Sequence, residues 1–269
     1  MALSDRDAGG DAGPTVELVR RGPTVELVLS NPAKLNALTG RMLDALDAHL
    51  DAIERDPSVR CALVIGAGDG PFSVGADVAE WGALGPGRFA REWVRRGHRT
   101  FDRLAQLSVP SVAVLHGHAF GGGLELAACC DVRTMAPSAT LALPEARVGV
   151  VPGWSGTQRL ARLLPAPVVR EMALFGRRVD ARRALALGFV AEVADDPLEA
   201  ARRMAAGLET LSPASLEIAK CQLGAAAGEA APAMVEALGS GWAGAGADRA
   251  EGVAAFREKR APAFGDGLG

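Results

Sequence analysis

The sequence predicts an α/β fold with an α-helical C-terminal region. Short apolar runs typical of strands alternate with helical patterns as far as about residue 195, and from residue 196 onward every segment has a helical pattern. No linker is long enough to separate two independent domains. We therefore expect a disordered tail over residues 1–12, a core over 13–195 and a helical region over 196–269.

The first half of the chain begins with a predicted β-hairpin. The motif GPTVELV occurs at 13–19 and 22–28, and both copies alternate apolar and polar residues on either side of RRGP. The loop SNPAKLNALT precedes leucines at helical spacing over 39–55. The elements expected next are a buried strand within 61–68, an arginine-rich helix over 88–107 and a strand over 111–117.

The second half alternates in the same way. The triple glycine at 121–123 opens a predicted helix over 122–130, and DVRTMA is typical of a strand. Residues 143–158 hold two prolines and three glycines, which predicts a long loop. The remaining expected elements are helices over 156–164, 167–175 and 180–188, the last ending at Gly188, and a short strand over 189–194.

Composition excludes several classes of protein. The chain has 269 residues, a formal net charge of -3 and 49% hydrophobic residues, which is typical of a globular protein and argues against a nucleic-acid partner. The four cysteines show no CxxC or Cys/His ligand spacing, so we expect no metal site and reduced, buried thiols in a reducing cytoplasm.

No targeting or membrane segment is expected either. The first residues, MALSDRDAGGDAG, lack the apolar stretch of a signal peptide. The longest mostly apolar stretch, 111–130, is interrupted by His116, His118 and Glu125, which argues against a membrane span. Among the glycine motifs, GAGDGP has a proline where a dinucleotide fingerprint needs glycine, and GWSGT is not a GxSxG nucleophile motif.

Two acids in apolar surroundings are the candidates for chemistry. Glu125 lies within a helix pattern that is apolar on all sides, and Glu145 follows Pro144 among apolar neighbours. Burial of a carboxylate is costly and raises its pKa, which is the property a general acid or base needs near neutral pH. The alternative is a structural acid held by an arginine or by backbone amides. Gly122 and the turn VGAD at 74–77 could aim backbone N–H groups at an oxyanion.

Five segments together resemble the enoyl-CoA hydratase/isomerase (crotonase) family. In order they are NPAKLNAL, PFSVGADVAE, AFGGGLELAACCD, PEARVGVVPGWSGTQRLARLLP and EGVAAFREKRAPAF, and the resemblance runs from about residue 16 to residue 264. It implies the crotonase spiral of repeated ββα units, followed by a helical C-terminal region that mediates trimers, two of which commonly stack into a hexamer. It implies no metal or redox cofactor, because coenzyme A arrives as part of the substrate.

The resemblance also implies roles for residues that match the motifs. Ala76 and Gly122 would donate backbone N–H groups to the thioester oxygen. Glu125 would help activate water for attack at C3, Glu145 would deliver a proton to C2, and Gly153 would hold the water through its backbone. The residues implied to line the coenzyme A path are Lys34, Ala37, Asp77 and Val78, with Phe256 and Lys259 reaching the adenosine part, across a subunit boundary.

Some positions depart from the family pattern. Trp154 and Ser155 stand where the family often has a small residue and glycine, and Ala79 stands where a lysine is often found. Trp154 and Trp81 either border the acyl group, which would favour short or flat acyl chains, or pack into the core. The arginines over 91–103 either supply charge for the coenzyme A phosphates or form a solvated face.

The function implied is hydration of a 2-enoyl-CoA to a 3-hydroxyacyl-CoA. Double-bond isomerisation is the main alternative, because one carboxylate can shuttle a proton. RNA binding, found in one lysine-rich branch of the family, is disfavoured because this chain has lysines only at 34, 220 and 259. A catalytically silent member is disfavoured because both acids are present.

Overall fold

The computed structural model describes residues 13–229 and 232–264, so the expected tail over 1–12 lies outside the described residues. The chain divides into two compact units, Met1–Leu216 and Glu217–Gly269. The boundary expected at residue 196, where the continuous helical pattern begins, stays a prediction.

The first unit is built on a mainly parallel sheet. Its strand order is β1-β2-β3-β4-β6-β9, and only β1 and β2 run antiparallel, which confirms the predicted hairpin. The strands are β1 (Thr15–Arg21), β2 (Thr24–Ser30), β3 (Cys61–Gly66), β4 (Ser111–Leu115), β6 (Val132–Met135) and β9 (Glu192–Val193). Every residue of β3 and β4 is buried, as expected for parallel strands covered on both faces.

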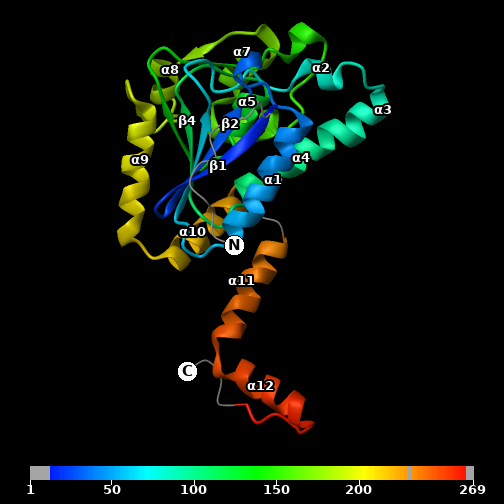
Figure 1. Cartoon of the computed structure of the whole chain (residues 1–269), viewed down its shortest axis with the longest axis vertical. Coiled ribbons are helices and arrows are strands. Elements are labelled where there is room, and N and C mark those ends of the chain that lie inside the picture. Colours follow the sequence, from blue (N-terminus) through cyan, green and yellow to red (C-terminus); the bar gives the residue numbers. More distant parts are fainter. Residues whose placement is uncertain (1–12, 230–231, 265–269) are drawn as a thin grey trace. The chain divides into compact units, whose positions relative to one another are not determined.

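Helices cover both faces of this sheet (Figure 1). Helix α9 (Pro197–Gly207) packs Ala201 and Ala205 against one face of β3 and β4. On the other face, α1 (Gly40–Glu54) buries its leucine stripe in the main core and contacts α4 (Arg95–Ala105). Helix α1 begins where the Thr39 side chain accepts the Met42 N–H at 3.2 Å.

A second, small sheet was not expected from the sequence. It has the order β5-β7-β8, with β5 (Ala119–Phe120), β7 (Thr140–Ala142) and β8 (Val179–Asp180). Strands of two or three residues are too short to show an alternating pattern. This sheet matters for the site because β5 leads directly into α5 (Gly122–Ala127), which ends at Ala127 rather than at residue 130.

Two further expectations need correction. The helix predicted over 88–107 consists of α3 (Pro86–Arg88), a π-helical stretch η2 (Phe89–Val94) and α4, so its register shifts before α4 begins. The loop predicted over 143–158 contains the 3₁₀ turn η3 (Glu145–Val148), whereas α6 begins at Gly156, as the helix predicted over 156–164 does. The other short elements of the first unit are η1 (Pro32–Lys34), α2 (Val78–Trp81) and η4 (Leu208–Thr210).

The remaining helices agree with the sequence pattern. They are α6 (Gly156–Leu163), α7 (Ala166–Phe175), α8 (Ala181–Ala186), α10 (Pro213–Ala226), α11 (Pro232–Ala245) and α12 (Ala247–Glu258). Gly188 has a φ of 75° just after α8, which is the left-handed position where a helix commonly ends on glycine. Within residues 13–229 and 232–264, no helix is long and apolar enough to cross a membrane.

Candidate active site

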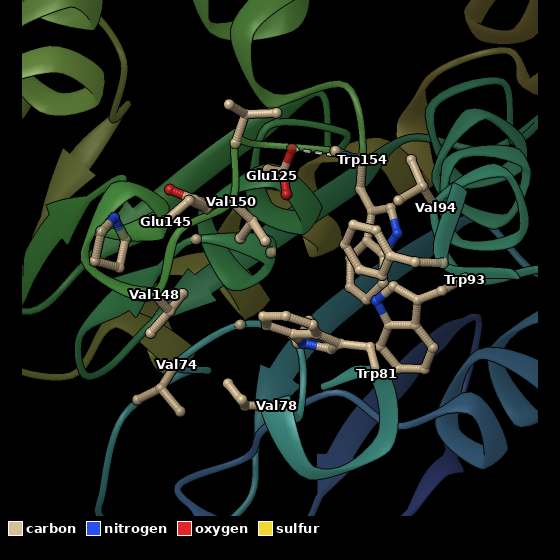
Figure 2. A pocket seen from close by; sticks show the side chains of 18 of the residues that line it. Val74, Val78, Trp81, Trp93, Val94, Glu125, Glu145, Val148, Val150 and Trp154 are labelled. Carbon is tan, nitrogen blue, oxygen red and sulfur yellow. Dashed lines mark hydrogen bonds between the residues drawn. The ribbon is translucent and has the colours of Figure 1, made fainter. Parts of the chain in front are cut away.

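One pocket of the first unit, about 280 Å³ in volume, contains both candidate acids. Its walls come from segments that are far apart in the sequence: the turn at 74–78, Trp81 of α2, η2, the start of α5 and the loop 144–154. Figure 2 shows Glu125 and Glu145 on one side of the pocket and the three tryptophans Trp81, Trp93 and Trp154 on the other. Valines make up much of the remaining wall, which also includes Arg147.

Glu125 is buried and held by backbone amides. Its side chain projects from α5, the residue is 3% exposed, and Oε1 accepts the N–H groups of Trp154 and Gly156, each at 2.8 Å. Burial raises the pKa of Glu125 to about 7, while these two amides lower it; nearby Glu145 raises it further and Arg159 lowers it. The carboxyl group therefore changes its protonation state near neutral pH.

Glu145 contrasts with Glu125 because its carboxyl oxygens have no hydrogen-bond partner among the residues that the structure describes. It begins η3 just after Pro144, and both Oε1 and Oε2 are buried without a hydrogen bond. Burial raises the pKa of Glu145 above its ordinary value. This carboxyl group lies against the same pocket as Glu125.

The two expected N–H donors lie next to each other. A Cβ added at Gly122 would stand 3.3 Å from the Ala76 nitrogen, and one at Gly75 would stand 3.0 Å from the Gly122 nitrogen. In the part of the chain that the structure describes, neither the Ala76 nor the Gly122 N–H donates to another protein group. Gly75, with a φ of 100°, permits this close approach of two chain segments.

Trp154 packs into the core and also lines the pocket, so core packing does not prevent it from bordering an acyl group there. Its indole is buried, with ring centroids 5.4 Å from Trp93 and 5.1 Å from Phe101. A Cβ at Gly122 would stand 2.9 Å from the same indole, so the ring fills the space beside that amide. Trp81 also lines the pocket, with its ring 5.3 Å from Phe89.

The structure brings some of the expected coenzyme A residues together. Lys34 Nζ lies 2.7 Å from Asp77 Oδ2, and Asp77 caps α2 by accepting the Ala79 N–H at 3.0 Å. Val78 and Gly153 line the pocket, and Ala37 is buried. Phe256 of α12 and Lys259, which ends that helix, belong to the second unit, so their role stays a prediction.

Sequence reasoning missed the contribution of η2. Phe89, Trp93 and Val94 line the pocket, although the arginine-rich pattern around them was typical of a solvated face. Several arginines of the flanking helices α3 and α4 form ion pairs: Arg88 with Glu92, Arg96 with Asp44, and Arg103 with Asp47 and Asp51. Among the described residues, no group of three His, Cys, Asp or Glu side chains is placed to hold a metal ion.

Comparisons with known proteins identify the family of the chain. The family model described as enoyl-CoA hydratase/isomerase matches residues 22–267. A probable enoyl-CoA hydratase of Bacillus subtilis is 36% identical over 234 residues, which covers 85% of this chain and 90% of that protein. The solved structure of Pseudomonas aeruginosa DspI aligns with a TM-score of 0.78 at 33% identity, covering 97% of this chain and 100% of that one.

A third relative is the solved enoyl-CoA hydratase from Bacillus anthracis, with a TM-score of 0.76 and 30% identity over 93% of this chain and 98% of that one. The chain therefore belongs to the enoyl-CoA hydratase/isomerase, or crotonase, family. Its mixed α/β fold with C-terminal helices is the crotonase fold, as the sequence predicted. Membership implies an acyl-CoA substrate.

Proposed function

We propose that the protein is an enoyl-CoA hydratase, which adds water across the 2,3 double bond of a 2-enoyl-CoA. The observation that carries this proposal is one mainly apolar pocket that holds buried Glu125, the buried carboxyl oxygens of Glu145 and two adjacent N–H groups without a protein acceptor among the described residues. The Bacillus subtilis and Bacillus anthracis relatives, whose names include enoyl-CoA hydratase, support the same reaction.

The Ala76 and Gly122 N–H groups bind the thioester oxygen in this proposal. Addition at C3 pushes electrons toward that oxygen and gives it enolate character. Two fixed donors in a site with little water stabilise this charge without having to reorganise. Their adjacency and the absence of other protein acceptors, in the described residues, support this role.

The two acids then divide the proton transfers. Glu125, deprotonated, accepts a proton from the attacking water, whose oxygen bonds to C3; the backbone of Gly153 helps to hold that water. Glu145, protonated, donates its proton to C2 as the enolate collapses. The matching positions in the family pattern support this division, and burial raises the pKa of each acid, which suits proton transfer.

The contacts with the coenzyme A part of the substrate are inferred from the family pattern. Lys34, Ala37, Asp77 and Val78 line the coenzyme A path, and Phe256 and Lys259 bind the adenosine part from a neighbouring subunit. We expect a homotrimer or a hexamer of two trimers in the cytoplasm. No separate cofactor takes part in the reaction, since coenzyme A belongs to the substrate.

Double-bond isomerisation is the second candidate. It needs one carboxyl group that moves a proton between C2 and C4, and the unpartnered carboxyl of Glu145 in the pocket is the observation that favours it. Hydration needs both acids, so the two reactions differ in how strongly they depend on Glu125.

The test is loss of the enoyl-thioester absorbance of crotonyl-CoA by wild type, Glu125→Gln and Glu145→Gln. We expect rapid loss with wild type and at least about a hundredfold slower loss with each variant, the scale of acid/base catalysis. No loss with wild type, combined with turnover of a 3-enoyl-CoA, would favour the isomerase. The variant His49→Ala is the control, because His49 bonds the Val16 carbonyl oxygen and does not line the pocket.

A further inference from the structure

Ser155 occupies a backbone conformation that serine rarely adopts. Its φ is 78°, in the left-handed region where an L-residue other than Asn or Asp is uncommon and costs energy. Ser155 lies between Trp154 and Gly156, whose N–H groups both reach Oε1 of Glu125 at 2.8 Å. The left-handed residue is therefore the link between the two amides that hold the predicted base.

A hydrogen-bonded chain of side chains fixes Ser155 from α4. Ser155 Oγ lies 2.7 Å from Nδ1 of His98, and His98 Nε2 lies 3.2 Å from Asp102 Oδ2. Because a carboxylate oxygen accepts hydrogen bonds, His98 Nε2 donates to Asp102, and Nδ1 bonds the Ser155 hydroxyl. The other carboxylate oxygen, Oδ1, accepts from Arg159 at 2.5 Å.

Helix α4 also packs against Trp154, the residue before Ser155. Gly97 precedes His98 in α4, and a side chain added at Gly97 would overlap the Trp154 indole. Helix α4 thus contacts two consecutive residues of the turn, Trp154 through packing and Ser155 through a hydrogen bond.

This Ser–His–Asp set is not arranged as a nucleophile. Ser155 is 7% exposed and is not among the residues that line the pocket, so its Oγ does not face an acyl group there. Its effect on the site runs through the backbone to Glu125.

We propose that His98 is a positioning residue for Glu125: its bond to Ser155 holds the left-handed turn that aims the Trp154 and Gly156 N–H groups at Oε1. The part of this inference that concerns turnover rests on the proposed hydratase function. The part that concerns the state of Glu125 does not, because the hydrogen bonds exist whichever reaction the site catalyses.

The expected consequence is a change in the pKa of Glu125. The two amide bonds lower this pKa and burial raises it, so weaker amide bonds leave it higher than in wild type. The other charged groups near Glu125 are Glu145, which raises its pKa, and Arg159, which lowers it. The Asp102–Arg159 pair does not include His98, so removal of the imidazole leaves that pair in place.

A double-mutant cycle tests the proposal: His98→Ala in wild type and in the Ser155→Gly variant. Glycine adopts a φ of 78° without strain and needs no anchor, so a positioning role for His98 disappears in the Ser155→Gly background. We expect His98→Ala alone to lower kcat for crotonyl-CoA about tenfold, the scale of one hydrogen bond, with KM changed less than about twofold. In the Ser155→Gly background the same change should alter kcat less than about twofold.

The second readout does not need turnover. The carboxyl stretching band of Glu125, assigned by its loss in Glu125→Gln, gives the pKa by infrared titration. We expect His98→Ala to raise this pKa in wild type and not in Ser155→Gly, with His49→Ala as the matched histidine control.

Equal effects of His98→Ala in both backgrounds, or none in wild type, would overturn the positioning role. Failure of wild type to hydrate any enoyl-CoA, with the background-dependent pKa shift present, would reject the hydratase proposal and leave the role of His98 standing.

Discussion

At the scale of one residue, Glu125 is a buried carboxyl group whose unfavourable burial is partly offset by hydrogen bonds. A carboxylate that is 3% exposed would ordinarily lose its charge, and here two backbone N–H bonds recover part of the lost hydration. The balance places its pKa at about 7 rather than at an ordinary acidic value. The unfavourable burial of Glu125 therefore gives its carboxyl group a pKa suited to proton transfer near neutral pH.

The raised pKa of Glu125 makes stability depend on pH. Because the folded state binds this proton more tightly than the unfolded state, the stabilisation is complete below pH 4.5 and is lost as pH rises toward 7, by about 3 kcal/mol in all. We expect Glu125→Gln, which has no charge to bury, to be more stable than wild type at pH 8. Urea unfolding at pH 5 and pH 8 measures this; an equal difference between the two proteins at both pH values would contradict it.

Gly97 gives a second prediction at this scale. A methyl group at residue 97 would overlap the rigid Trp154 indole, so Gly97→Ala should lower the free energy of unfolding by about 1–3 kcal/mol. The matched control is Gly87→Ala, since an added Cβ there meets nothing within 4 Å. Thermal unfolding of both variants decides the point, and equal behaviour of the two would show that Trp154 can move aside.

At the scale of elements, sequence reasoning succeeded where a pattern was long. The strands at β3 and β4 are apolar runs and α1 carries a leucine stripe, so their periods were visible. It failed for β5, β7 and β8, which are too short to have a period, and for η2, where arginines concealed the pocket-lining Trp93. It also missed the bond between His98 and Ser155, which lie 57 residues apart.

The aromatic wall formed by η2 and the loop before α6 predicts substrate preference. Trp154 fills space beside Gly122 and packs against Trp93, so we expect four-carbon enoyl-CoA to be turned over faster than the sixteen-carbon substrate. Trp154→Ala should raise the ratio of kcat/KM for ten-carbon over four-carbon substrate at least about tenfold, the scale of a few methylene groups. This ratio is independent of the fraction of enzyme folded. An unchanged ratio would place the acyl chain away from Trp154.

At the scale of the whole molecule, both the site and the expected assembly depend on distant parts of the chain. Glu125 and Glu145 were recognisable from their apolar neighbours, whereas the adjacency of Ala76 and Gly122 depends on how separate segments meet. The second unit carries apolar side chains that are exposed in a single chain, among them Trp242 at 72% and Phe256 at 85%. Such exposure is typical of surfaces that bind another protein.

The exposed apolar side chains of the second unit and the family pattern together predict that several copies of the chain assemble. We expect sedimentation to give the mass of three or six chains, and a charge at an exposed apolar position of the second unit, as in Trp242→Glu, to shift the population toward smaller species. A wild-type protein that sediments as one chain would contradict the expected subunit-spanning role of Phe256 and Lys259.

The central claim is that water is added to the acyl chain. The most direct measurement is mass spectrometry of the thioester formed from crotonyl-CoA in water labelled with heavy oxygen. The account predicts a 3-hydroxyacyl-CoA that carries one labelled oxygen with wild type, and almost none with Glu125→Gln or Glu145→Gln. A product of unchanged mass with a moved double bond, or label incorporation that survives loss of either acid, would contradict it.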